Sequence, residues 1–285
     1  MVARYLIMFK KLSVIGVGHI ARAFLFAVTA GDGAFSPADV TLWNRTPEHI
    51  DDLIRSGHPR AETPEDAFAA GELVLLGIKP QNYAALLSRI AEAGCDPEGK
   101  IVITPAAGVS SAAVSDRLGG CGVVRIMPNT PIAIRRGVIA VCQNGRVPDK
   151  AFQDVCRLLS RCGSVYRAAE TEMDGMTAAT SSATAYVYRF IHAITEAGRS
   201  CGVDLPLLEK AVAETFIGAA ELLLSSGRPA EELIAAVRSP NGTTEQALAA
   251  FDRLGLERIV EEAMLACANR AGELGRESLP PDENN

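Results

Sequence analysis

The sequence predicts an α/β domain with a doubly wound, mainly parallel sheet, followed by an all-α domain. Two observations predict this order: short β-branched runs alternate with helix-length segments over residues 9–168, and strand signals end after about residue 168. Such alternation favours parallel strands with helices on both faces of the sheet. We therefore expect one domain at 9–168, a helical domain at 169–276, and a disordered, solvated tail at 277–285.

The expected elements of the first domain follow one another along the chain. The helix-length segments lie at 19–30, 46–56, 64–70, 82–93 and 110–118. The expected strands are contained in the runs KLSVIGVG, DVTLWN, ELVLLGIKP, KIVITPAAG, GVVRIMPN and GVIAVCQN.

One segment of the expected helical domain, LPLLEKAVAETFIGAAELLLSSG, is apolar on most of its faces. A helix of this kind requires burial all round, which a small five-helix domain scarcely provides. The sequence therefore predicts a homodimer or higher homo-oligomer formed through this domain.

Composition and charge exclude several classes of protein. The 285 residues carry a net charge of −6 without a basic block, whereas nucleic-acid binding requires clustered Lys and Arg. The apolar run in the N-terminal MVARYLIMFKK is too short for a signal peptide or a membrane span. A start at Met8 would make residues 1–7 a dispensable extension. The seven scattered cysteines suit reduced thiols in a cytoplasmic protein, and their spacing predicts no metal site.

The segment SVIGVGHIARAF has the spacing of a dinucleotide-binding loop. Gly16 permits a tight turn after the first strand, Gly18 lets a pyrophosphate approach the backbone, and Ala21 permits close packing of helix on strand. The following helix offers free N–H groups to phosphates. The strand–turn–helix context favours a Rossmann nucleotide site over a purely structural glycine turn.

The second strand ends in LWNRT, where a carboxylate for the ribose 2′-hydroxyl of NAD is usual. Asn44 and Arg45 are suited instead to a 2′-phosphate, with Thr46 as the cap of the next helix. This favours NADP(H), with NAD(H) possible. The alternative is a surface arginine beside a helix cap.

Three further runs, GIKPQN, TPAAG and RIMPNTP, follow strands whose carboxyl ends meet at one edge of a parallel sheet. Singly, each is typical of a turn that ends a strand. Together they favour a cofactor groove along that edge.

Taken in order, GxGxxA, KPQ, AAG, VVRIMPNTP and SP-x-GTT resemble the pyrroline-5-carboxylate reductases, and the likeness spans roughly residues 11–275. The resemblance implies reduction of the cyclic imine 1-pyrroline-5-carboxylate to L-proline with NAD(P)H, for proline biosynthesis, by a Rossmann domain followed by a helical dimerisation domain. It implies substrate contacts by Ser182, Asn241, Gly242, Thr243 and Thr244. By motif match and the residues discussed above, the expected cofactor contacts are Ile15, Gly16, Gly18, His19, Ile20, Asn44, Arg45, Gly77, Ile78, Lys79, Pro80, Pro105, Ala106 and Ala107.

Imine reduction requires a positioned hydride donor, a hydrogen bond at nitrogen and an anchor for the carboxylate, but no strong base. Thr243 and Gln246 have capping-box spacing, and the helix they open presents N–H groups to a carboxylate. Thr244, the expected catalytic residue, is placed to donate its hydroxyl to the imine nitrogen. Helix capping alone is the alternative role for these threonines.

The chain departs from the family pattern near the expected substrate pocket. Where the family has SGSGPAY, this chain has TSSATAY at residues 180–186. The added Cβ atoms and the lost proline are expected to straighten the helix and narrow the space beside it. His192 replaces an acidic residue of the family and is expected at a surface or interface. Asn241 replaces a glycine and tolerates a left-handed turn. Pro64 replaces an Asn that contacts cofactor in some relatives.

These departures leave other functions open. One is reduction of a related cyclic imine acid, such as a piperideine carboxylate, and another is a catalytically inactive NADP-binding paralogue. A β-hydroxyacid dehydrogenase is disfavoured, because the only lysine after Lys150 is Lys210, inside the apolar helix.

Overall fold

A computed structural model describes residues 7–31 and 33–280. The chain forms two compact units, one made of residues up to Ser182 and from Ala266 onward, the other of Ala183–Leu265. The proposed extension at residues 1–7 lies almost wholly outside the described part, as does the end of the expected tail, 281–285.

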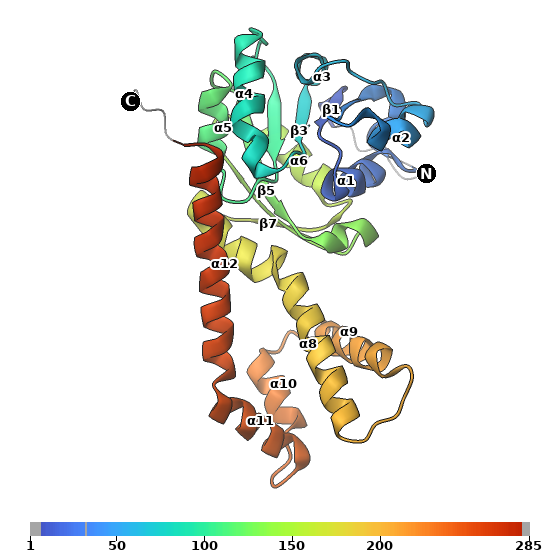
Figure 1. The fold of residues 1–285 in the computed structure, drawn as a ribbon, viewed down its shortest axis with the longest axis vertical. Coiled ribbons are helices and arrows are strands. Elements are labelled where there is room, and N and C mark those ends of the chain that lie inside the picture. Colours follow the sequence, from blue (N-terminus) through green and yellow to red (C-terminus); the bar gives the residue numbers. More distant parts are fainter. Residues whose placement is uncertain (1–6, 32, 281–285) are drawn as a thin grey trace. The chain divides into compact units, whose positions relative to one another are not determined.

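The first unit is built on a seven-stranded sheet in the order β2-β1-β3-β4-β5-β6-β7 (Figure 1). Neighbouring strands are parallel except for β5 and β6, which are antiparallel. The predicted Rossmann class is therefore confirmed, and β7 is a strand that the sequence analysis missed. The strands are β1 (Leu12–Ile15), β2 (Val40–Trp43), β3 (Leu73–Leu76), β4 (Ile101–Thr104), β5 (Gly122–Pro128), β6 (Gly137–Gln143) and β7 (Gly163–Arg167).

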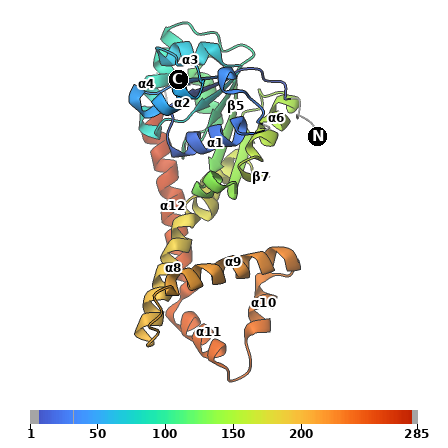
Figure 2. The same cartoon turned by 90° about the vertical axis from the view of Figure 1, so that its right-hand side faces the viewer.

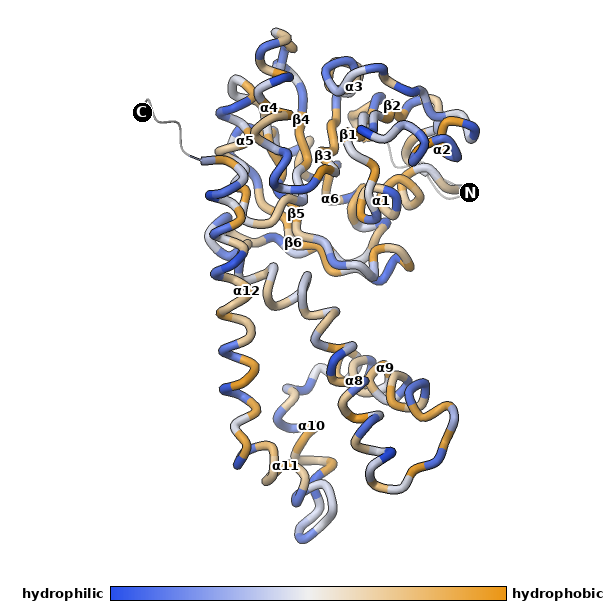
Figure 3. The backbone as a smooth tube through the Cα atoms, in the orientation of Figure 1, coloured by the Kyte–Doolittle hydropathy of each residue, from blue (hydrophilic) through white to orange (hydrophobic). Residues whose placement is uncertain are grey.

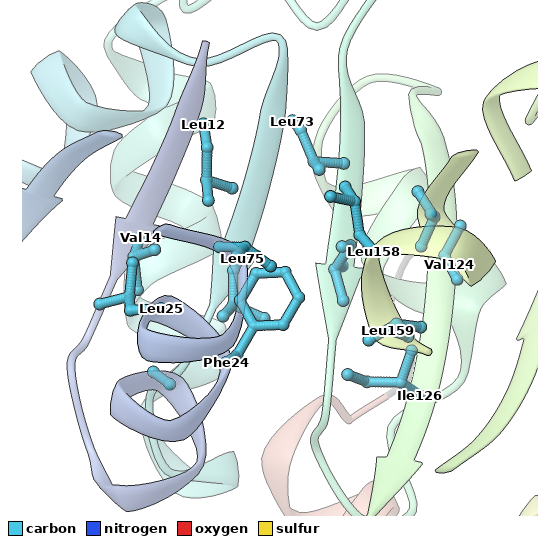
Figure 4. Close-up of a cluster of buried hydrophobic side chains, with 14 of the residues drawn as sticks. Leu12, Val14, Phe24, Leu25, Leu73, Leu75, Val124, Ile126, Leu158 and Leu159 are labelled. Carbon is cyan, nitrogen blue, oxygen red and sulfur yellow. The ribbon is translucent and has the colours of Figure 1, made fainter. Parts of the chain in front are cut away.

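Two apolar layers bury the faces of this sheet. Successive strand residues point to opposite faces, so Val14 lies in one layer and Ile15 in the other. The Val14 layer, shown in Figure 4, includes Phe24 of α1 (His19–Thr29) and Leu158 of α6 (Asp149–Leu159). The opposite layer receives side chains from α3 (Pro64–Ala70), α4 (Tyr83–Glu92) and α5 (Ser111–Arg117).

The expected helices of this unit are confirmed within about a turn of their predicted bounds. The segment expected at 46–56 is a 3₁₀ turn, η2 (Pro47–Ile50), that leads into α2 (Asp51–Arg55). Further 3₁₀ turns are η1 (Pro37–Asp39), η3 (Pro80–Asn82), η4 (Thr130–Ile134) and η5 (Glu170–Glu172).

The first unit also contains chain that the sequence assigned to the helical domain. These segments are α7 (Met173–Met176), the π-helix η6 (Thr177–Ser181) and the last turns of α12 (Leu256–Ser278). A Cβ on Gly108 would lie 2.6 Å from the backbone nitrogen of Gly275, so α12 meets the loop after β4 through backbone contact. Leu279 is buried in the layer under α4, so the described start of the expected tail is part of the fold. The sequence analysis placed the start of the tail too early, because composition does not show where a helix packs.

Arg125 of β5 attaches the start of these segments to the sheet. Its guanidinium, 3% exposed, contacts Glu170 at 2.6 Å and Asp174 at 2.7 Å. Burial raises the pKa of Glu170, but hydrogen bonds from Ser111 and Arg125 outweigh burial and leave the pKa below its ordinary value. The ion pairs therefore hold residues 170–174 against β5 in a charged state.

The second unit consists of α8 (Ala183–Ser200), α9 (Leu208–Ser226), α10 (Ala230–Val237), α11 (Thr243–Leu254) and the start of α12. Thr195 is its only buried residue across 183–265, a range that the structure describes completely. Hydrophobic residues recur along α9, which is seen side-on in Figure 2 and coloured by hydropathy in Figure 3. A unit with so little buried surface lacks an apolar core of its own. Among the described residues, no helix is both long and apolar enough to cross a membrane.

His58 makes the stability of the first unit dependent on pH. The side chain is 5% exposed, Nδ1 lies 3.4 Å from the carbonyl of Val40, and burial lowers the pKa of the imidazole below its ordinary value. The unfolded chain therefore binds the proton more readily, so folding stability is present above pH of about 6.5 and is lost as pH falls toward the folded pKa.

We expect the free energy of unfolding to decrease between pH 7 and pH 5 in the wild type, and less so in His58→Gln. Urea denaturation at a series of pH values measures this slope. His192→Gln, at an exposed position, serves as the control and should keep the wild-type slope. Equal slopes for wild type and His58→Gln would contradict the prediction.

Candidate functional site

A groove of about 380 Å³ lies at the carboxyl ends of β1, β2 and β3. This is the edge at which doubly wound sheets bind nucleotides. The groove is lined by Gly16, Val17, Gly18, Trp43, Asn44, Arg45, Thr46, His49, Pro64, Gly77, Ile78, Lys79, Asn82, Ala85, Leu86 and Arg89.

The glycine loop forms one wall of this groove by close backbone contact. Gly16 has φ of 87°, and a Cβ there would lie 2.5 Å from Cγ2 of Ile78. A Cβ on Gly77 would lie 2.2 Å from the carbonyl oxygen of Gly16, so the loops after β1 and β3 fit together only with glycine at these two positions. A Cβ on Gly18, by contrast, would lie 3.9 Å from the carbonyl oxygen of Gly77, an ordinary van der Waals contact, so packing within the protein does not require glycine there. A glycine that lines the groove without this requirement suits a ligand that approaches the backbone.

The first turn of α1 has the properties of a phosphate site. Gly18 is its N-cap, so no side chain accepts the first N–H groups, and the turn contains no acid. Free N–H groups at a helix N-terminus attract anions through hydrogen bonds and the helix dipole. The backbone of Gly18, which lines the groove, and this turn together fit the pyrophosphate of a dinucleotide.

Asn44 holds the glycine loop in place. Its Oδ1 accepts the N–H of Val17 at 3.0 Å, and its Nδ2 donates to the carbonyl of Thr46 at 2.8 Å. Both ends of the amide are therefore used within the protein, which gives Asn44 a positioning role besides the predicted contact with cofactor.

The predicted cofactor residues divide into two groups. The structure brings Gly16, Gly18, Asn44, Arg45, Gly77, Ile78 and Lys79 together in the groove. Ile15 is buried in the sheet, Ile20 packs against the core, and His19, Pro80, Pro105, Ala106 and Ala107 lie outside the lining, so their contacts stay predictions.

One side of the groove comes from α4 and was not predicted. Asn82 is the N-cap of α4, and Leu86 and Arg89 follow it by four and seven positions, so the three residues share one side of the helix. The i, i+4 and i+7 spacing was visible in the sequence, but only the packing of α4 beside β3 shows that this face borders the groove.

A second cluster joins the MPN motif to the altered helix. Asn129, 9% exposed, accepts the N–H of Val138 at 2.9 Å and donates Nδ2 to the carbonyl of Thr180 at 3.3 Å. Ser181 donates its hydroxyl to the carbonyl of Pro128 at 2.8 Å. The structure thus brings together two motifs that are about fifty residues apart in the sequence.

The expectation of a straightened helix at TSSATAY is wrong. Residues 177–181 form a π-helix, in which the N–H of Ser182 donates to the carbonyl of Thr177 at 2.8 Å. Thr177 and Thr180 donate their hydroxyls back to the carbonyls of Met173 and Met176. These side-chain bonds compete with the α-helical ladder, a frequent cause of distorted helices, and π-helical turns are common at functional sites.

Ser182, a predicted substrate residue, is half-buried beside α12. The Sγ of Cys267 donates to its hydroxyl at 3.2 Å. Nothing in the sequence indicated this contact, because the two residues are distant along the chain.

We expect Asn129→Asp to raise KM for the imine substrate that the family resemblance implies, while leaving the Kd for the expected cofactor, NADPH, unchanged. Aspartate still accepts the N–H of Val138 but repels the carbonyl oxygen of Thr180. Loss of this hydrogen bond costs about 1–3 kcal/mol and releases the π-helix that precedes Ser182. Steady-state kinetics and cofactor titration measure the two constants.

Asn144→Asp is the matched control. Asn144 accepts from Val123 at 3.1 Å and donates to the carbonyl of Cys121 at 3.0 Å, the same pattern at the other end of β5. It should lose similar stability without a change in KM. Equal KM values for the two variants would remove Asn129 from the site.

In the second unit, residues 239–244 form a tight turn that begins α11. The N–H of Gly242 donates to the carbonyl of Ser239 at 3.0 Å, with Pro240 and Asn241 between them. Asn241 has φ of 57°, as expected for a residue that replaces glycine in a left-handed turn. A Cβ on Gly242 would lie 3.0 Å from the carbonyl oxygen of Ser239, so Gly242 must remain small.

The predicted capping box of Thr243 and Gln246 is wrong. Gly242 is the N-cap, and Thr243 is already the first helical residue. The carboxylate of Glu245 instead accepts the N–H of Asn241 at 2.8 Å. Since no side chain caps α11, the N–H groups of Thr243, Thr244 and Glu245 have no hydrogen-bond partner among the described residues, and neither do the hydroxyls of the two threonines.

Comparison with known proteins agrees with both halves of this description. The family model described as pyrroline-5-carboxylate reductase dimerisation matches residues 170–274, and that described as NADP oxidoreductase, coenzyme F420-dependent, matches residues 11–108. Pyrroline-5-carboxylate reductase of Corynebacterium melassecola is 32% identical over 93% of this chain and 98% of its own length. The Pseudomonas aeruginosa reductase is 34% identical over 76% of this chain and 79% of its own. A crystal structure of Plasmodium falciparum pyrroline carboxylate reductase with NADP bound, 22% identical, covers 93% of this chain and 98% of its own with a TM-score of 0.82.

Proposed function

The chain belongs to the pyrroline-5-carboxylate reductase family, and from this premise we propose that it reduces 1-pyrroline-5-carboxylate to L-proline with NADPH. The observation that carries the proposal is the groove at the glycine loop: Gly18 in its lining, an uncapped first turn of α1, and Arg45 in place of an acid after β2. These features suit a dinucleotide that carries an extra phosphate.

The cofactor supplies the hydride when bound, and the residues of the chain bind and orient the reactants. We assign cofactor contact to the predicted residues of the groove, with Gly18 and the first turn of α1 at the pyrophosphate. The iminium carbon of the substrate is already electrophilic, so positioning contributes most of the acceleration.

The substrate contacts are proposed at the start of α11. The N–H groups of its first turn and the hydroxyl of Thr243 bind the carboxylate, and the hydroxyl of Thr244 donates a hydrogen bond to the ring nitrogen. Asn241 and Gly242 give the turn the shape that exposes these groups, and Ser182 is a further substrate contact. The uncapped helix and the free threonine hydroxyls support this assignment.

The second unit supports assembly of several copies. The dimerisation model that matches residues 170–274 indicates homo-oligomerisation, and we propose a homodimer formed through a functional domain at 169–276. The apolar residues exposed on α9 and the near absence of burial across 183–265 support this proposal. We also propose a cytoplasmic location, in keeping with seven thiols that are all unpaired.

Turnover of purified protein tests the proposed function. With NADPH and 1-pyrroline-5-carboxylate, we expect oxidation of the cofactor in step with formation of proline. The six-membered piperideine carboxylate is assayed beside it, because the substitutions at 180–184 lie near Ser182. Activity on the larger ring alone would replace the substrate, and NADPH binding without turnover of either imine would indicate an inactive paralogue.

A further inference from the structure

A pair of buried hydroxyl groups lies between the ends of β3 and β4. Tyr83, the first residue of α4, and Thr104, the last residue of β4, are both 0% exposed, and their side-chain oxygens are 2.8 Å apart. The hydroxyl of Tyr83 donates to the carbonyl of Leu76 at 2.8 Å. The N–H of Ala106 donates to Oγ1 of Thr104 at 3.3 Å. A chain of three hydrogen bonds therefore runs from Ala106 through both side chains to Leu76.

The chemistry of the groups gives this chain one direction. A carbonyl can only accept, so the single proton of the Tyr83 phenol points to Leu76. The hydroxyl of Thr104 must then donate to Tyr83, which leaves its lone pairs to accept the N–H of Ala106. Burial raises the pKa of Tyr83, so the phenol keeps the proton on which this order depends. Removing either hydroxyl leaves a buried polar group without its partner.

The hydrogen-bond chain joins two loops beyond the point where the strands pair. The backbone pairing of β3 with β4 ends at Leu75 and Ile103. Leu76 leads into residues 77–79, which line the groove, and Ala106 lies in the loop after β4 that is predicted to contact the cofactor. The two hydroxyls therefore hold the loop after β4 to the loop after β3.

The other end of the loop after β4 is also fixed. Gly108 has φ of 73°, and a Cβ there would collide with the carbonyl oxygen of Ala271 on α12. Residues 105–107 thus lie between the hydrogen bond to Thr104 and the backbone contact at Gly108. A loop that is held at both ends loses little conformational freedom when a ligand binds to it.

We propose that Tyr83 and Thr104 are positioning residues for the cofactor: through the N–H of Ala106 they fix the loop after β4 relative to the groove-lining loop after β3. The proposal rests on the proposed function. Both side chains are buried and neither lines the groove, so they act through the backbone that they hold. Without the hydroxyls, the cofactor would have to order this loop as it binds, which weakens binding.

Titration of the full-length protein with NADPH tests the proposal. We expect Thr104→Val, which keeps the size of the side chain, to raise the Kd for NADPH about five- to twentyfold, the effect of a buried group left without its partner. Tyr83→Phe should act similarly, and the double variant should bind no more weakly than the weaker single variant, because both substitutions break the same chain. Thr104→Ser keeps the hydroxyl and should bind NADPH as the wild type does.

Ser115→Ala is the matched control. Ser115 is also buried, and its hydroxyl donates to the carbonyl of Cys121 at 2.7 Å, just before β5 and at the opposite edge of the sheet. This variant should lose thermal stability much as Thr104→Val does, with an unchanged Kd for NADPH.

Hydrogen exchange of the protein without cofactor gives an independent readout. The amides of residues 106–109 should exchange faster in Thr104→Val and Tyr83→Phe than in the wild type, and at the wild-type rate in Ser115→Ala. Faster exchange together with an unchanged Kd would show that the hydroxyls hold the loop without positioning the cofactor.

The inference is also overturned by an equal rise in Kd in Ser115→Ala, or by a Thr104→Ser variant that binds as weakly as Thr104→Val. If Thr104→Val does not fold, Tyr83→Phe decides, since it removes only the oxygen of the phenol. A wild type that does not bind NADPH would instead contradict the proposed function itself.

Discussion

Replacing Thr244 with alanine is expected to lower kcat for imine reduction about 10²–10³-fold, the usual effect of removing one donor from a site of developing charge. The Kd for NADPH should not change, because the predicted cofactor residues are all on the first unit. Steady-state kinetics and cofactor titration on the same preparation measure the two quantities.

The local structure makes this a clean substitution. Thr244 is half-buried in the first turn of α11, and its hydroxyl has no partner among the described residues, so alanine removes no internal hydrogen bond. Alanine also has the higher helix propensity. A large loss of turnover therefore reports on a ligand contact and not on unfolding of the helix.

Two variants separate the roles of the neighbouring threonines. Thr244→Ser keeps the hydroxyl and should restore most of kcat. Thr243→Ala should act mainly on KM, since its proposed contact is with the carboxylate, which is bound alike in ground and transition states. Wild-type turnover in Thr244→Ala would remove Thr244 from the catalytic site.

The double variant Ile217→Glu with Leu224→Glu is expected to convert the assembled protein into monomers of low stability. The two residues are seven positions apart on α9, so they share a face, and they are 57% and 82% exposed in the single chain. Full burial of such side chains contributes about 1.5–3 kcal/mol each, and a two-fold interface counts every residue twice. Loss of this burial should raise the dissociation constant of the assembled protein by more than about 10⁴-fold.

Sedimentation velocity across a range of concentrations measures the assembly, and thermal unfolding measures the stability. Lys210→Gln is the control on the same helix: it removes only an exposed pair with Glu214, 3.7 Å apart, and should leave both measurements unchanged. A wild type that is monomeric and as stable as the double variant would refute the role of this face.

The sequence predicted most of the first unit because its elements are specified locally. Each strand from β1 to β4 is a short, mostly apolar run bounded by turn residues, and α3 (Pro64–Ala70) begins and ends where the sequence placed it. β7 was missed because its segment, GSVYR, has no apolar run: it is an edge strand whose residues Ser164, Tyr166 and Arg167 are exposed. The prediction of a capping box was wrong because an N-cap and the first residue of a helix are adjacent positions. Spacing alone does not show which of the two positions Thr243 occupies.

The sequence by itself determined the fold class, the glycine loop and the family, since each is carried by contiguous residues whose spacing follows from the geometry of strands, turns and helices. Only the tertiary structure decided that Asn44 clamps the glycine loop and that Asn129 holds a π-helix. Both are contacts between segments far apart in the chain. Periodicity does not encode them, because they depend on which side chains the packed sheet brings within hydrogen-bonding distance.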